Sequence, residues 1–282
     1  MFSNVIVGVD GYDGGRDALR LAKALSTSRL TLVGAYPRDE IPLRGSPPGY
    51  ESLLRSDVQD ALASAAAQAG VDADLVPRGD DSPARALHHE AERIGADLIV
   101  IGSAHHGPVG RLLLGDVGRG VLQGAPCPVA VAPKQAGDAT PRTIAVGFDG
   151  SAEATAALEL AARFAQEHAA GLTLIVVWED PPLPIAETAM VYDLEQMKAD
   201  RAKGAEELLA ATLADLPSSV AGRVLHGRPD VVLAEQAERL GLLFVGSRGW
   251  GPVKRLALGS TANRLVHRLP CPVIVVPRPA AD

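Results

Sequence analysis

The chain has few of the features that mark secreted, membrane-spanning or nucleic-acid-binding proteins. It contains only two cysteines in 282 residues, too few for the disulfide framework of a small secreted domain. No apolar run approaches the roughly 20 residues that cross a bilayer, and the first residues do not resemble a secretion signal. The formal net charge of -7 argues against a nucleic-acid partner. We therefore expect a cytoplasmic protein with no membrane and no nucleic-acid partner.

What the chain does contain is a repeat of itself. VIVGVDGYDGGRDALRLA (residues 5–22) matches IAVGFDGSAEATAALELA (144–161), and APCPVAVAP (125–133) matches LPCPVIVVP (269–277). Two further matches lie between these in the same order, which predicts two homologous domains in tandem rather than a solenoid. We expect the domains to cover residues 1–134 and 142–282. The polar stretch KQAGDATPRT, residues 134–143, is then the linker.

Short apolar runs alternate with longer amphipathic stretches in each half. In the first half NVIVGV, LTLVGA, ADLV, DLIVIG and PVAVA are typical of strands covered on both faces. RDALRLAKAL, ESLLRSDVQDALASAAAQAG and SPARALHHEAERIG have the helical period. This alternation predicts an α/β fold of two tandem doubly wound parallel sheets, each five-stranded. Such sheets bind ligands at the carboxyl ends of their strands, where the strand order reverses.

The segment GSRGWGPVKRLALGST (residues 246–261) follows the fourth predicted strand of the second half. Its first glycines let the main chain approach a ligand without a Cβ. Its last glycine precedes a predicted helix, whose N-terminal N–H groups and dipole suit an anion. The segment is neither a P-loop nor a Rossmann fingerprint, because the lysine motif is missing and the glycines follow the fourth strand. The residues expected to hold phosphates are Gly246, Arg248, Gly249, Gly259, Ser260 and Thr261.

The spacing Gly-x2-Gly-x9-Gly-Ser, Asp149 in VGFDGS, the PCPV opening of the last strand and the tandem arrangement together resemble the universal stress protein family, in its nucleotide-binding branch. The resemblance implies a Rossmann-like sheet of order 3-2-1-4-5, similar to adenine nucleotide alpha hydrolases, that binds ATP. It implies that Asp149 contacts the ribose and adenine region and that Val177 offers its backbone to adenine. Mg²⁺ is expected only as a companion of ATP, and no protein metal site is expected.

The resemblance also implies how the halves assemble. In this family the last strands of two domains pair antiparallel, so the tandem copies are expected to form an intramolecular pseudo-dimer. This pairing would cover strand edges that are otherwise exposed. A homodimer of whole chains and an unidentified protein partner are further expectations.

The first half departs from this pattern. Its counterpart of the glycine segment is GSAHHGPVGRLLLGDV, residues 102–117. There His105 replaces a glycine, Asp116 replaces Ser260 and Val117 replaces Thr261. A carboxylate about 4–5 Å from a phosphate would cost about 3–4 kcal/mol at an effective dielectric near 20. We therefore expect a weak site at most, which could take a less charged adenosine-like or cyclic nucleotide, or nothing. Its candidate residues are Asp10, Ala35, Gly102, His105 and Gly115.

Three functions are compatible with these patterns. The leading hypothesis is an ATP-binding protein of stress response or signalling, because no nucleophile–base pair is evident. The alternatives are a slow ATPase or adenylate-handling enzyme, with Asp149 as the only candidate base, and a tandem scaffold that binds no nucleotide. Cys127 and Cys271 are interpreted as buried small hydrophobes, and His88 and His89 as part of a solvated helix face.

Overall fold

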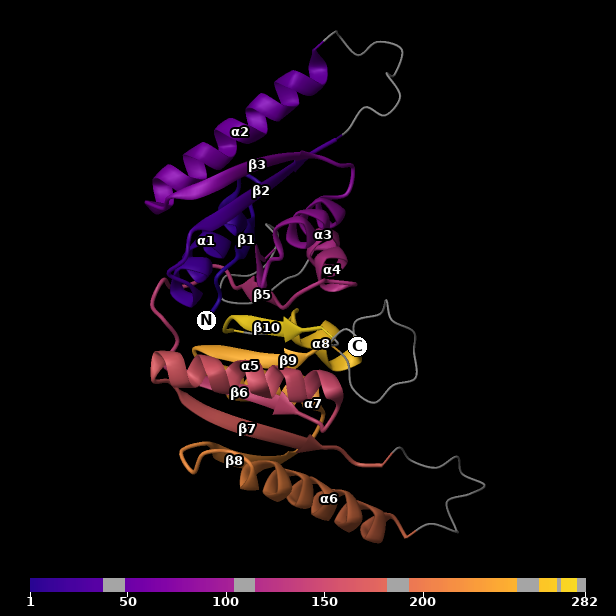
Figure 1. Cartoon of the computed structure of the whole chain (residues 1–282). Coiled ribbons are helices and arrows are strands. Elements are labelled where there is room, and N and C mark those ends of the chain that lie inside the picture. Colours follow the sequence, from indigo (N-terminus) through magenta and orange to yellow (C-terminus); the bar gives the residue numbers. More distant parts are fainter. Residues whose placement is uncertain (38–48, 104–114, 182–192, 248–258, 268–269, 278–282) are drawn as a thin grey trace, which may run out of the picture.

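A single ten-stranded sheet runs through the chain in the order β3-β2-β1-β4-β5-β10-β9-β6-β7-β8 (Figure 1). The computed structural model describes residues 1–37, 49–103, 115–181, 193–247, 259–267 and 270–277. The first half contains β1 (Val5–Gly8), α1 (Asp13–Leu25), β2 (Leu30–Tyr36), α2 (Tyr50–Ala69), β3 (Ala73–Gly79), α3 (Pro83–Ile94), β4 (Leu98–Gly102), α4 (Asp116–Leu122) and β5 (Val129–Ala132). The second contains β6 (Thr143–Phe148), α5 (Ala152–His168), β7 (Gly171–Trp178), α6 (Leu194–Ala214), β8 (Ala221–His226), α7 (Pro229–Ala237), β9 (Leu242–Gly246), α8 (Ser260–Leu265) and β10 (Val273–Val276).

The predicted strand order 3-2-1-4-5 is confirmed in both halves. β3-β2-β1-β4-β5 and β8-β7-β6-β9-β10 are each parallel throughout. The two five-stranded sheets join because β5 pairs antiparallel with β10, with Ala130 opposite Ile274. Both strands are fully buried. Each thus covers the edge that the other would expose, as the family resemblance implied.

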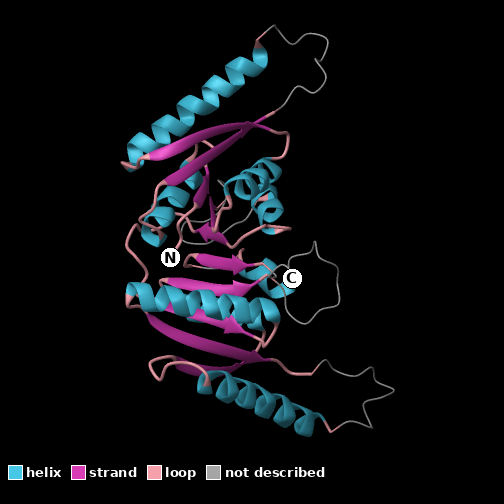
Figure 2. Ribbon diagram, in the orientation of Figure 1, coloured by secondary structure: helices cyan, strands magenta, loops and turns pink. Residues whose placement is uncertain are grey.

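Helices cover both faces of this sheet (Figure 2). Successive strand residues point to opposite faces, so Val5 and Val7 join one apolar cluster while Ile6 joins the other. The first cluster includes buried residues of α1, α2, α5 and α6, and the second includes residues of α3, α4, α7 and α8. Each cluster contains residues of both halves. The apolar core is therefore continuous across the β5–β10 junction.

Local sequence signals explain where the helices begin and end. Ser82 caps α3 by accepting a hydrogen bond from the N–H of Arg85, and Pro83 occupies its first turn. Ser151 caps α5 in the same way. α2 ends at Gly70, whose φ of 60° is a left-handed conformation typical of the glycine that closes a helix.

The interpretation of His88 as part of a solvated face is wrong. Its Nε2–H donates to the carbonyl oxygen of Val121 at 2.8 Å, because α4 packs against this side of α3. The neighbouring Glu90 is also buried, whereas His89 is exposed. Adjacent residues on one helix thus have different environments.

The predicted linker is docked against α1 rather than held away from it. The backbone N–H of Gln135 donates to Oδ2 of Asp17 at 3.0 Å, and Asp17 is buried. Ala136 is buried as well. Gln135 itself has a φ of 60°, a left-handed conformation that few non-glycine residues adopt.

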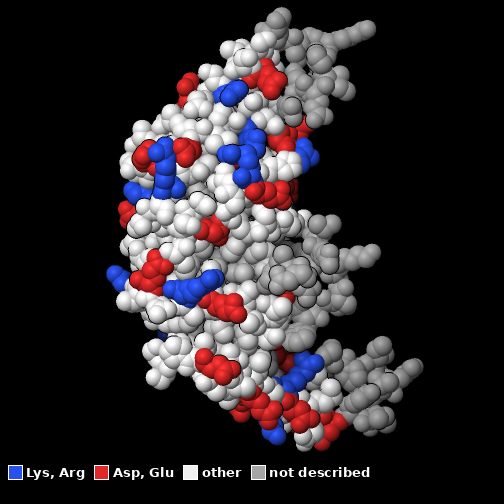
Figure 3. Space-filling view, in the orientation of Figure 1, with Lys and Arg blue, Asp and Glu red and all other residues white. Residues whose placement is uncertain are grey.

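The surface of the described residues carries mixed charge. On the face drawn in Figure 3, acidic and basic side chains are interspersed among uncharged ones. No helix in the described ranges combines the length and apolar character that a membrane crossing requires.

Candidate functional site

Both halves present an aspartate in the same turn after their first strand. Oδ1 of Asp10 accepts a hydrogen bond from the N–H of Tyr12 at 3.0 Å, and Oδ1 of Asp149 accepts one from Ser151 at 3.0 Å. The glycine after each aspartate has a φ of 79° or 78°, a conformation that favours glycine. Both carboxylates are exposed at the carboxyl ends of their strands. Sequence and backbone therefore place a fixed acceptor at the point where each sheet reverses its order.

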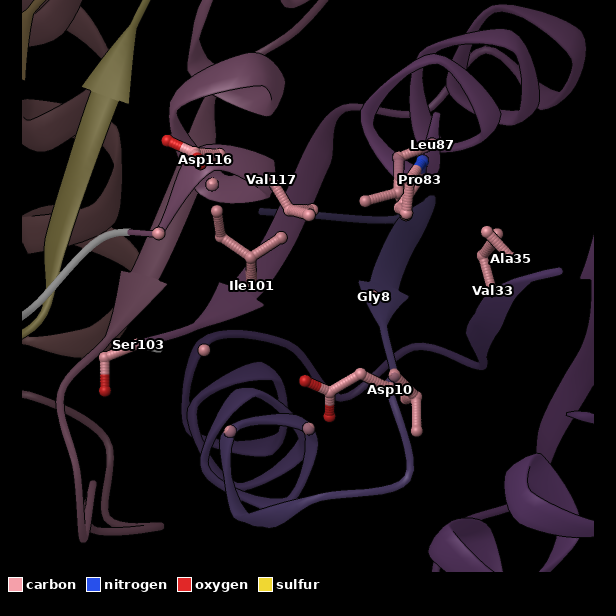
Figure 4. Close-up of a pocket in the computed structure, with 16 residues that line it drawn as sticks. Gly8, Asp10, Val33, Ala35, Pro83, Leu87, Ile101, Ser103, Asp116 and Val117 are labelled. Carbon is pink, nitrogen blue, oxygen red and sulfur yellow. The ribbon is translucent and has the colours of Figure 1, made fainter. Parts of the chain in front are cut away.

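A cavity of about 380 Å³ lies beside Asp10 in the first half (Figure 4). It opens at the carboxyl ends of β1, β2 and β4, against the first turns of α1, α3 and α4. In Figure 4 Ile101 and Val117 lie across the space from Asp10. Its non-glycine lining consists of Val9, Asp10, Val33, Ala35, Pro83, Leu87, Ile101, Ser103, Asp116 and Val117.

This cavity brings together four of the five residues predicted for the first half: Asp10, Ala35, Gly102 and Gly115. His105 lies outside the described residues. The apolar residues that form the walls of this cavity were not among the predicted site residues. Two periodicities could have found them: Val33 lies two residues before Ala35 on the same strand face, and Pro83 and Leu87 lie one helical turn apart.

The charge of the described lining is negative. Asp10 and Asp116 are its two carboxylates, and none of the described lining residues is a lysine, arginine or histidine. Oδ1 of Asp116 lies 3.0 Å from Nη2 of Arg119, but both side chains are well exposed. Such a surface pair is worth little, so it neutralises the carboxylate only weakly.

In the second half the predicted residues lie at corresponding places. Asp149 follows β6, Val177 lies in β7 and Gly246 ends β9. The N–H of Gly259 donates to the carbonyl oxygen of Ser247 at 2.7 Å, which brings the start of α8 to the end of β9. Ser260 and Thr261 open α8. Arg248 and Gly249 lie outside the described residues.

The glycines that end β4 and β9 have a packing role that the sequence analysis did not include. A Cβ on Gly102 would lie 1.9 Å from the carbonyl oxygen of Gly14 in α1. A Cβ on Gly246 would lie 2.8 Å from Cβ of Glu153 and 2.9 Å from the backbone nitrogen of Ala154, both in α5. These glycines let a helix approach the end of a strand closely.

The last helix of each half, α4 or α8, is held in place by a different contact. In the second half Asp230 is almost fully buried at the start of α7, with Oδ2 2.9 Å from Nη2 of Arg228 and Oδ1 3.7 Å from Nη1 of Arg264 in α8. No local motif marks this cluster, because Arg264 lies far from Asp230 in the sequence. In the first half the corresponding contact is the hydrogen bond from His88 to Val121.

Neither cysteine has the exposure of a redox centre. Cys127 and Cys271 are both buried and unpaired, and burial raises the pKa of each thiol to about 12. The interpretation of both as small buried hydrophobes is confirmed. Among the described residues, no three His, Cys, Asp or Glu side chains lie together as potential metal ligands.

Known proteins are similar to this chain in sequence and in fold. Residues 1–133 and 140–277 each match the universal stress protein family. A universal stress protein of Mycobacterium tuberculosis is 31% identical over 187 residues, which cover 64% of this chain and only 61% of that relative. One from Thermus aquaticus is 34% identical over 141 residues, which cover 48% of this chain and 98% of that one.

The fold agrees across the whole chain with a solved relative. The crystal structure of a universal stress protein from Archaeoglobus fulgidus has a TM-score of 0.67 and 23% identity, and the match covers 99% of this chain and 97% of that one. With two domain matches that account for most of its residues, the chain belongs to the universal stress protein family.

Proposed function

We propose that the second half binds ATP and that the protein acts as a nucleotide-linked signalling protein of the stress response. The observation that carries the proposal is the convergence of Asp149, the end of β9 and the start of α8 at the point where the strand order reverses. The Gly259–Ser247 hydrogen bond maintains this convergence. Ligands bind open α/β sheets at such a point.

The described residues suit a nucleotide. The Asp149 carboxylate is exposed and oriented by Ser151, so it can accept hydrogen bonds from ribose hydroxyls. Ser260 is exposed and Thr261 half-buried at the start of α8, where a helix offers N–H donors and these two residues add hydroxyl donors. The proposed ATP-binding residues are Asp149, Val177, Gly246, Arg248, Gly249, Gly259, Ser260 and Thr261. When bound, ATP supplies the phosphate charge that these donors recognise, with Mg²⁺ as its companion.

Signalling requires that ATP favour one conformation of the chain over another. The shift in population cannot exceed the difference in ATP affinity between the two conformations. The proposal therefore includes a cytoplasmic protein partner that binds the ATP-favoured conformation.

The proposal is tested by replacing two residues at the start of α8 with the residues at the corresponding positions of the first half. We expect Ser260→Asp combined with Thr261→Val to weaken ATP binding at least tenfold, because two hydroxyl donors are lost and a carboxylate is added. Titration calorimetry on the full chain measures the affinity, and small molecules released by denaturation identify ligands that co-purify. The matched control is Thr212→Val, a half-buried position on α6 whose hydroxyl donates to the carbonyl oxygen of Leu208. No ATP binding at millimolar concentration, or equal binding by the double variant, would overturn the proposal.

A further inference from the structure

We propose that the first-half cavity binds an uncharged nucleoside and discriminates against its phosphorylated forms, with Asp116 as the residue that sets this specificity. The inference rests on the proposed function only in its choice of a nucleoside as the ligand class. It concerns a different site from the one proposed for ATP.

The size and walls of the cavity favour a compact, flat ligand. Its volume of about 380 Å³ lies at the lower end of the roughly 300–1,000 Å³ of ligand pockets. Val33 and Ala35 on β2, Leu87 on α3 and Ile101 on β4 supply apolar surface from separate elements. Such walls suit the faces of an aromatic base.

The polar group beside these walls requires a ligand that donates hydrogen bonds. Asp10 lies at the end of β1, and its Oδ1 is held by the N–H of Tyr12. An ionised carboxylate only accepts hydrogen bonds. Sugar hydroxyls or an amine can donate to it, whereas a phosphate dianion cannot. A nucleoside combines such hydroxyls with an aromatic base.

The opposite end of the cavity is unsuited to an anion. Asp116 and Val117 both line it, at the positions that Ser260 and Thr261 occupy in the second half. The first half therefore lacks both hydroxyl donors at the start of α4 and carries instead a carboxylate at the rim of the cavity, which Figure 4 shows pointing outward from the space beside Asp10. Asp116 is exposed and only weakly neutralised by Arg119, so a phosphate at this rim would be repelled.

The test uses the full chain and adenosine, AMP and ATP as probes. In the wild type saturated with ATP, we expect adenosine still to bind once per chain and AMP to bind this remaining site at least fivefold more weakly. Asp116→Ser introduces the residue of the second half. It should strengthen AMP binding at least fivefold and change adenosine binding less than twofold. Titration calorimetry measures both affinities.

Two matched variants assign the binding to one half. Ala35→Phe fills the first-half cavity and should abolish adenosine binding while ATP binding persists. Val177→Phe, at the corresponding position of β7, should do the reverse. Circular dichroism and a thermal unfolding curve verify that each variant is folded. If Ala35→Phe failed to fold, Val117→Phe, at an exposed position that also lines the cavity, would serve in its place.

The outcomes separate this inference from the ATP proposal. Adenosine binding that Ala35→Phe abolishes would support the inference even in a chain that binds no ATP. The absence of adenosine binding at millimolar concentration would overturn it, whether or not ATP binds. Equal affinities for adenosine and AMP, or an affinity ratio unchanged by Asp116→Ser, would also overturn it.

Discussion

At the scale of single residues, the buried carboxylate of Glu90 is a group whose charge depends on its neighbours. Glu90 has no exposed surface. Its Oε1 and Oε2 each lie 3.0 Å from Nε of Arg93, and Oε2 lies 2.9 Å from Nη2 of Arg78 on β3. Hydrogen bonding from Arg93 lowers the pKa of Glu90, an effect that burial opposes. The ionised form is therefore the one that fastens α3 to the edge of the sheet.

This pKa shift gives stability a definite dependence on pH. Because the folded pKa of Glu90 lies below its unfolded value, its stabilisation is present above the unfolded pKa and is lost as pH falls through the folded pKa. We expect Glu90→Gln to lower the free energy of unfolding by about 3 kcal/mol at pH 7 and to flatten its decline below pH 4.5. Urea unfolding at pH 7 and at pH values below 4.5 measures the free energy of unfolding of the wild type and the variant. The control is Glu92→Gln, an exposed residue of the same helix, and an equal effect of the two substitutions would refute the role of the ion pair.

The cysteines provide a second prediction at this scale. Because burial raises the pKa of Cys127 and Cys271 to about 12, both thiols stay protonated and inaccessible in the native protein at pH 8. We expect a thiol reagent to modify neither in native buffer and both in denaturant. Mass spectrometry counts the adducts. Rapid native labelling of either cysteine would contradict the observed burial.

Single residues show where sequence reasoning succeeds and where it ends. Asp10 and Asp149 could be predicted because each follows a recognisable strand within one short motif. Glu90 and Asp230 could not, since they have partners on other elements: Arg78 approaches Glu90 only because α3 packs on β2, the strand that pairs with β3. The apolar walls of the cavity likewise depend on which strands are neighbours.

At the scale of elements, periodicity was sufficient for the strands and the helices, because both periods are clear and the sequence repeats, whereas the strand order was implied by the family resemblance. The packing role of the glycines that end β4 and β9 could not be predicted from periodicity. Gly102 and Gly246 were interpreted as aids to a turn and to the approach of a ligand. The structure adds a contact with the first turn of α1 or α5, which only the packed fold reveals.

This close packing predicts the cost of adding one methyl group. In Gly102→Ala the new Cβ would lie 1.9 Å from a backbone oxygen of α1, so the helix must shift. We expect a loss of about 2–3 kcal/mol of stability, as in an overpacked core. Gly137→Ala is the control, because a Cβ there meets nothing within 4 Å. Denaturant unfolding compares the two, and similar midpoints would show that α1 does not restrict this position.

At the scale of the whole molecule, the β5–β10 pair joins the two halves into one sheet. Val131 pairs with Val273, and both are completely buried. The apolar clusters on each side of the sheet continue across this pair. Destabilising the junction from one half should therefore destabilise the other.

Fluorescence can report on that coupling, because both tryptophans, Trp178 and Trp250, belong to the second half. We expect Val131→Asp, a buried unpaired charge in the first half, to lower stability by about 4 kcal/mol or more. The urea midpoint from tryptophan fluorescence should fall together with that from circular dichroism. An unchanged fluorescence midpoint would mean that the second half folds independently of β5.

Because the two domains lie in one chain, each can acquire substitutions that the other lacks. Separate identical subunits meeting through one twofold strand pair carry every substitution twice, so their cavities cannot diverge. In a single polypeptide each position varies on its own, so an aspartate at position 116 changes the first half while Ser260 stays at the corresponding place in the second. If both proposals hold, one chain would recognise two metabolites of different charge.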